Sequence, residues 1–157
     1  MPLGTSVLLI GYGNPGRRDD GLGPALAERM EKKDLKGVDI VSDYQLNIEH
    51  AHDLAAYDVV IFADAQGGDL AGRGNARPFD FKPLKAGNPT SFSTHSVSPQ
   101  AVLRLAEDLF QAQTRAYLLG ITGFEFVEIQ EKLTDMASAN LDHAEEFISD
   151  WLADLLK

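Results

Sequence analysis

Apolar and polar positions follow one another along the chain in blocks that predict strands and helices in turn. Short, continuously apolar runs are typical of strands buried on both faces of a parallel sheet, and apolar residues three or four positions apart indicate amphipathic helices. The predicted strands span residues 6–10, 38–41, 58–63, 77–81 and 115–121. The predicted helices span residues 23–33, 49–56 and 98–111, followed by a C-terminal helix with the stripe Leu141, Ala144, Ile148, Trp151, Leu152 and Leu155. In the third helix, we expect Val102, Leu105, Leu109 and Phe110 to face inward.

This alternation of strands and helices predicts an α/β fold, a three-layer α/β/α sandwich around a twisted, five-stranded, mostly parallel sheet. Right-handed crossovers place the first strand in the middle, and the apolar strand at 58–63 is also expected to be central. The segment 77–81 contains Pro78 and follows the preceding strand without a helix. We therefore expect it to run antiparallel at one edge, where a proline is tolerated.

Length, charge and cysteine content limit the classes of function. A chain of 157 residues favours one domain, residues 1–157. It has no cysteine, which excludes a disulfide scaffold, a thiolate zinc site, an iron–sulfur cluster and a cysteine nucleophile. Its 14 Lys and Arg against 24 Asp and Glu give a net charge of −10, so we expect neither nucleic-acid nor membrane-surface partners. No apolar run approaches the ~18–20 residues of a membrane span, and the cytoplasm is the expected location.

A glycine-rich turn follows the first predicted strand. The segment Gly11-Tyr12-Gly13-Asn14-Pro15-Gly16 has the G-x-G-x-x-G spacing of a dinucleotide-binding loop, and Asp43 ends the second strand, where an acidic residue can bind a ribose. However, the next helix is expected to begin only near Gly23, and Asp19 and Asp20 before it would repel a pyrophosphate. A nucleotide-binding module using Gly11, Gly13 and Gly16 is therefore the alternative, not the preferred, interpretation.

Two carboxylates and one imidazole are expected to converge at one edge of the sheet. Asp20 follows the first strand, Asp64 follows the third, and His95 precedes the third helix. Ligands of open α/β sheets bind outside the carboxyl ends of the strands, where the strand order reverses. Two carboxylates and one imidazole suit a divalent metal site with open positions. The simpler alternatives are that Asp19 and Asp20 cap the helix, that Asp64 caps a turn, and that His95 is an ordinary loop residue.

Several segments, in order along the chain, resemble the signature of the hydrogenase maturation proteases, the endopeptidases that trim the large subunit of nickel–iron hydrogenases. The first are Leu9-Ile10-Gly11-Tyr12-Gly13-Asn14-Pro15 and Asp19-Asp20-Gly21-Leu22-Gly23-Pro24. They are followed by Gln45-Leu46, Val60-Ile61-Phe62-Ala63-Asp64-Ala65, Ser93-Thr94-His95, Ser98-Pro99-Gln100, Leu118-Leu119-Gly120-Ile121 and Glu131 with Leu133-Thr134. No single motif is decisive, but the ordered set covers nearly the whole chain.

The resemblance implies a twisted five-stranded sheet between helices and a metal-contacting, catalytic trio of an acidic residue, an aspartate and a histidine. Carried over, the trio falls on Asp20, Asp64 and His95. The supporting loop is then formed by Gly11, Gly13, Asn14, Asp19 and Gly21. This chain departs from the family at two places, because the first acidic ligand is often glutamate, and glycines often stand where this chain has Gln130 and Lys132.

The resemblance also implies a reaction. The enzyme removes the C-terminal extension of a hydrogenase large-subunit precursor after nickel insertion, and the metal it contacts is nickel presented by that substrate. The nickel can polarise the scissile carbonyl or a water, or Asp64 or Asp20 can act as general base; the sequence does not choose between them. A monomer without a bound nucleotide is expected. A peptidase with its own resident metal and broad substrates is a further alternative.

Overall fold

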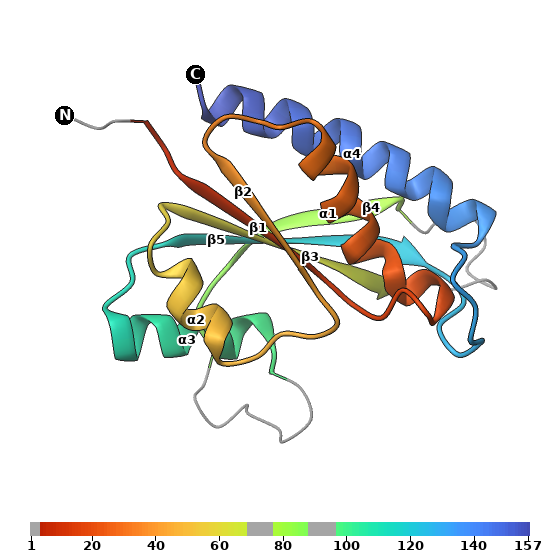
Figure 1. Cartoon of the computed structure of the whole chain (residues 1–157), viewed down its shortest axis with the longest axis horizontal. Coiled ribbons are helices and arrows are strands. Elements are labelled where there is room, and N and C mark those ends of the chain that lie inside the picture. Colours follow the sequence, from red (N-terminus) through yellow and green to blue (C-terminus); the bar gives the residue numbers. More distant parts are fainter. Residues whose placement is uncertain (1–3, 69–76, 88–96) are drawn as a thin grey trace.

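The protein is described here from a computed structural model that covers residues 4–68, 77–87 and 97–157 (Figure 1). The strands are β1 (Val7–Tyr12), β2 (Val38–Asp43), β3 (Val59–Gly67), β4 (Phe79–Leu84) and β5 (Arg115–Gly123). The helices are α1 (Leu22–Lys32), α2 (Glu49–Leu54), α3 (Pro99–Phe110) and α4 (Asp135–Leu155), with a 3₁₀ turn, η1 (Arg18–Gly21), before α1. The strands form a sheet in the order β2-β1-β3-β5-β4, in which only β4 runs antiparallel to its neighbour. The predicted α/β/α sandwich with an antiparallel edge strand is confirmed.

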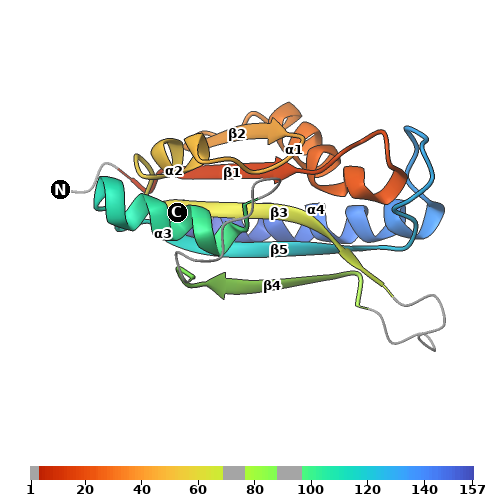
Figure 2. The same cartoon turned by 90° about the horizontal axis from the view of Figure 1, so that it is seen from below.

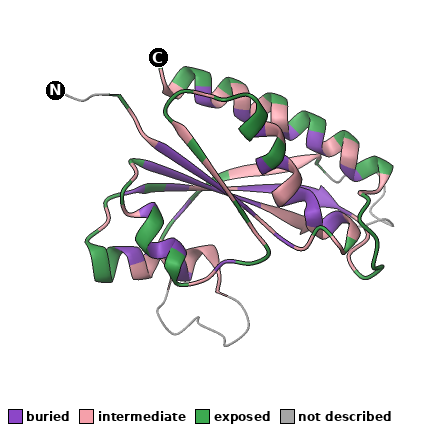
Figure 3. Ribbon diagram, in the orientation of Figure 1, coloured by how far each residue is buried: buried purple, intermediate pink, exposed green. Residues whose placement is uncertain are grey.

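Helices cover both faces of the sheet, with α1 and α4 on one face and α2 and α3 on the other (Figures 1 and 2). Side chains alternate between the two faces along each strand. In β3, Ile61 and Ala63 pack under α1 and α4, whereas Val60 and Phe62 pack under α2 and α3. All four are completely buried, as are the central parts of the neighbouring strands (Figure 3).

The strand order refines the sequence prediction. β1 lies inside the sheet between β2 and β3, but the central position belongs to β3, because β5 and β4 are both added on its far side. β3 is longer than predicted because its pairing with β5 continues to Gly67 and Gly123. Asp64 therefore lies within a strand and not after it. β4 includes Pro83, whose missing N–H is tolerated at an edge.

The helix ends follow from capping and from where the sheet stops. The Ser98 hydroxyl accepts the Ala101 N–H at 3.1 Å and starts α3. The expectation that Leu109 and Phe110 face inward is wrong, since they are 59% and 42% exposed. The last turn of α3 extends past the sheet (Figures 1 and 2), and Phe110 there contacts the edge of α2 through the ring of His52, with centroids 5.2 Å apart. Within the described ranges, no helix combines the length and the apolar composition needed to cross a bilayer.

The C-terminal helix packs through the stripe that the sequence predicted. Leu141, Ala144, Ile148 and Leu152 are buried in α4. Trp151 lies at the side of this stripe and contacts Phe81 and Tyr117 edge-on, with ring centroids 5.1 and 4.9 Å apart. These aromatic contacts attach the edge strand β4 to α4, which makes the stripe part of the core.

Candidate functional site

The candidate site lies at the carboxyl ends of the neighbouring strands β1 and β3. The helix after β1 covers one face, and the helix before β3 covers the other. Such a switch point leaves a crevice at the edge of an open α/β sheet. The 3₁₀ turn η1 brings Asp20 to this edge, and β3 carries Asp64 there.

Two glycines allow η1 and the start of α1 to lie directly on the strand ends. Gly13 has a φ of +142°, and a Cβ there would collide with the carbonyl oxygen of Asp20. A Cβ on Gly23 would collide with the carbonyl oxygens of Tyr12 and Ala63. The chain itself thus fills the space beside these glycines. Close packing within the chain is therefore sufficient to explain why glycine stands at both positions, and no bound phosphate is needed to explain it.

The Asp20 carboxylate is fixed by the loop that follows β1. Its Oδ2 accepts the Asn14 N–H at 2.7 Å, and the Asn14 side-chain oxygen accepts the Gly16 N–H at 2.9 Å. Helix α1 has Gly21 as its N-cap residue, without a side-chain cap. The alternative that Asp19 and Asp20 cap this helix is therefore wrong.

Asp19 is a buried anchor with no exposed surface. Its carboxylate accepts the N–H groups of Phe124, Glu125 and Thr134 at 2.7, 3.1 and 2.8 Å, and the Thr134 hydroxyl at 2.8 Å. Burial by itself would raise the pKa of Asp19, but these hydrogen bonds outweigh it and hold the pKa below its ordinary value. Asp19 thus ties η1 to the connection between β5 and α4.

Asp64 lies on the face of the sheet covered by α2 and α3, level with Tyr12 of β1. Burial raises its pKa to about 6, and the negative charge of Asp20 adds to this effect. Hydrogen bonds from the Tyr12 hydroxyl and the Ala65 N–H oppose the rise. Burial and the charge of Asp64 in turn raise the pKa of Tyr12, which stays a hydrogen-bond donor. Asp20 and Asp64 are therefore close enough to interact electrostatically.

The third predicted residue, His95, lies outside the described residues. Among residues 4–68, 77–87 and 97–157, no three Asp, Glu or His side chains form a group that could hold a metal ion. Asp43, the residue considered for a ribose, lies beside buried His50, with Nε2 and Oδ2 3.5 Å apart. His50 Nδ1 accepts the Asn47 N–H at 2.9 Å, so this histidine is used within the chain.

Sequence reasoning missed the neighbours of Asp64. Tyr12 was not singled out, although the pairing of Gly11 with Ala63 puts Tyr12 and Asp64 side by side on one face. Two residues further along β3, the side-chain amide of Gln66 donates to Asp80 Oδ2 of the edge strand β4 at 2.7 Å. These neighbours could not be predicted because the sequence does not reveal the register in which β1 and β3 pair.

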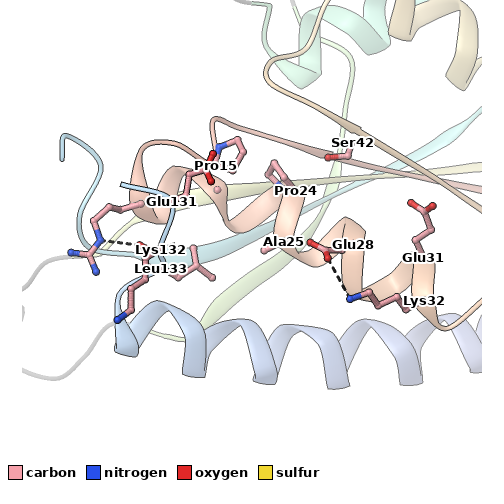
Figure 4. Close-up of a pocket in the computed structure, with 12 residues that line it drawn as sticks. Pro15, Pro24, Ala25, Glu28, Glu31, Lys32, Ser42, Glu131, Lys132 and Leu133 are labelled. Carbon is pink, nitrogen blue, oxygen red and sulfur yellow. Dashed lines mark hydrogen bonds and ion pairs between the residues drawn. The ribbon is translucent and has the colours of Figure 1, made fainter. Parts of the chain in front are cut away.

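An open groove of about 730 Å³ lies along the outer side of α1, away from Asp64 (Figure 4). Pro24 and Ala25 form one wall, and Lys132 and Leu133 form the other. Arg18 closes the end nearest to η1, where its Nε donates to the Lys132 carbonyl at 2.8 Å. The groove thus borders the turn that carries Asp20 but is not lined by the carboxylate pair.

Solved structures provide the comparison with known proteins, since no protein-family model and no curated protein matches the chain. The maturation protease HycI from Thermococcus kodakarensis KOD1 superposes with a TM-score of 0.72 at 20% identity, over 94% of this chain and 92% of that one. HybD from the same species gives 0.70 at 17% identity, over 93% and 98%. The E. coli endopeptidase HybD gives 0.64 at 24% identity, over 95% and 93%.

The described residues define an open α/β protein with two neighbouring carboxylates at its switch point. Its fold is that of the hydrogenase maturation proteases. The superpositions, with TM-scores of 0.64–0.72, establish this shared fold although the sequences are only 17–24% identical.

Proposed function

We propose that the chain is an endopeptidase that removes the C-terminal extension of a nickel–iron hydrogenase large subunit after nickel insertion. The proximity of Asp20 and Asp64 at the switch point carries the proposal. The solved structures that share the fold support it, because they are of hydrogenase maturation proteases. In this proposal Asp20, Asp64 and His95 contact the nickel held by the substrate.

Oxygen and nitrogen ligands without a thiolate suit brief contact with a metal that belongs to the substrate. The nickel polarises the scissile carbonyl or the attacking water. In the net reaction, water adds its hydroxyl to the acyl carbon and a proton to the leaving nitrogen as the C–N bond breaks. The alternative to polarisation by nickel is that Asp64 acts as general base without binding the metal, since burial raises its pKa in the metal-free protein to about 6, close to neutral pH.

Co-expression with a large-subunit precursor tests the proposal, with intact mass spectrometry of the precursor as the measurement. Wild type is expected to shorten the precursor by its C-terminal extension. Asp64→Asn and His95→Ala are expected to leave it at full length. The control Asp108→Asn changes an exposed carboxylate of α3 that pairs with Arg104, and it is expected to cleave like wild type.

Each outcome separates one part of the proposal. A precursor left intact by wild type contradicts the proposed activity. Cleavage by Asp64→Asn at the wild-type rate contradicts the assigned site. A thermal-shift series with NAD, ATP, nickel and zinc tests the nucleotide alternative, which predicts stabilisation by a nucleotide and none by a metal. Metal analysis of the purified protein tests the alternative of a resident-metal peptidase.

A further inference from the structure

Large apolar side chains that are exposed in the described part of the chain occur in three places. Tyr44 and Ile48 lie between β2 and α2, and Leu109 and Phe110 lie on the last turn of α3. The most exposed are on the connection between β5 and α4, where Val127 is 79% and Ile129 is 82% exposed, with Met136 following at the start of α4. Exposed apolar residues that cluster on a functional edge are typical of interaction sites.

The β5–α4 connection is fixed by hydrogen bonds although these side chains are in water. The Glu125 carboxylate accepts the N–H groups of Val127 and Glu128, both at 2.9 Å. These two bonds, together with the one between Arg18 and Glu128, hold the turn that presents Val127. The turn is therefore ordered before any partner arrives, and binding loses little conformational entropy.

The second half of the connection is held against the loop before η1. The Gln130 N–H donates to the Gly16 carbonyl at 2.8 Å, and the Gln130 carbonyl accepts the Arg18 N–H at 3.0 Å. Ile129, which precedes this pair, is nevertheless exposed. Polar contacts thus fix the backbone on both sides of Ile129, while its side chain is 82% exposed.

Asp19 fixes the β5–α4 connection relative to Asp20 and Asp64. Asp19 binds its first residues, Phe124 and Glu125, and also Thr134 at its end. Asp19 directly precedes Asp20 in the chain. A partner bound to the connection is therefore held at a defined place relative to Asp20.

We propose that Val127 and Ile129 form a docking surface for the large-subunit precursor, a role that rests on the proposed function. The connection carries three carboxylates, Glu125, Glu128 and Glu131, against one lysine, Lys132. Glu128 is paired with Arg18, but the excess of acid remains over the whole chain, whose net charge is −10. The segment of the precursor that binds here is therefore apolar and basic. The surface sets the affinity for the protein substrate and takes no part in bond cleavage.

The test is a double variant, Val127→Ser with Ile129→Ser, assayed for binding to the nickel-loaded precursor and for cleavage of it. We expect at least about a tenfold weaker affinity and a correspondingly higher KM, with kcat unchanged. The conservative pair Val127→Leu with Ile129→Leu is expected to bind within about threefold of wild type. Leu109→Ser, at another exposed apolar position on the last turn of α3, is the control and is expected to bind like wild type.

The outcomes separate the two proposals. An affinity of the double serine variant within twofold of wild type overturns the docking surface and leaves the proposed function standing if cleavage continues. An equal loss with Leu109→Ser also overturns it. Binding that depends on the two side chains, without cleavage by wild type, supports the docking surface and contradicts the peptidase. No binding of the precursor by wild type contradicts both.

Discussion

The Asp64 carboxylate is expected to lower the stability of the fold at neutral pH. Burial raises its pKa to about 6 from an ordinary value of 3.8. Between these values the native carboxyl holds a proton that the unfolded chain has already lost, so stability decreases as the pH rises through this range. Above pH 6 the native state carries the full penalty of a buried, charged carboxylate beside Asp20.

The magnitude follows from the pKa. One pKa unit corresponds to about 1.4 kcal/mol, so titration near 6 in place of 3.8 amounts to at most about 3 kcal/mol. Asp64 keeps some contact with solvent, and screening by water reduces this value, so we expect about 1–3 kcal/mol. The substitution Asp64→Asn removes the charge while leaving an oxygen that still accepts the Tyr12 hydrogen bond.

Urea unfolding of the metal-free protein between pH 4.5 and pH 8 measures this effect. The free energy of unfolding of Asp64→Asn, relative to wild type, is expected to increase by about 1–2 kcal/mol from the acid to the alkaline end, because the part of the effect below pH 4.5 lies outside this range. Asp108→Asn, at an exposed position, is the control and is expected to stay within about 0.5 kcal/mol of wild type. A difference between Asp64→Asn and wild type that is independent of pH would refute the reasoning.

Three further changes test the packing around the site. Asp19→Asn is expected to lower the free energy of unfolding, measured in urea, by about 2–4 kcal/mol, because an amide N–H would face backbone donors. The lowered pKa of Asp19 also means that its charged form stabilises the wild-type fold, and this stabilisation is lost as the pH falls through that pKa. Gly23→Ala is expected to lower Tm by at least about 5 °C because its Cβ meets two strand carbonyls, whereas Gly67→Ala, with open space around it, is expected to leave Tm nearly unchanged. Tyr12→Phe is expected to raise the pKa of Asp64 above its value of about 6, and a downward shift in an NMR titration would contradict the role of that hydrogen bond.

Most of the fold was predictable because each element buries a distinct apolar pattern. The unbroken apolar run of β3 is typical of a strand buried on both faces, and the apolar stripe of α4 repeats about every 3.6 residues; the sequence displays both directly. The ends of the elements were less predictable. β3 continues through polar Asp64 and Gln66 because β5 pairs with it there, and Leu109 is exposed because α3 extends past the sheet. Both depend on neighbours that are distant in sequence.

The meeting of Asp20 and Asp64 was predictable from topology alone. Parallel strands that are neighbours end at the same edge, so residues after β1 and at the end of β3 must lie near one another. The direction of each side chain was not predictable in the same way. It depends on the register that brings Tyr12 level with Asp64, and on the glycines that bring η1 down onto the strand ends.

The adjacent residues Asp19 and Asp20 show why sequence pattern alone stops short of the site. A 3₁₀ turn has three residues per turn, so neighbouring side chains point about 120° apart. One of the two carboxylates must therefore turn into the protein when the other turns toward the strand ends. The inward one, Asp19, accepts four hydrogen bonds from the β5–α4 connection, and the outward one, Asp20, accepts one from Asn14 and interacts with Asp64. The hydrogen-bond donors around each carboxylate decide which of the two identical residues is structural. The donors to Asp19 lie more than a hundred residues further along the chain, where no local sequence pattern connects them to it.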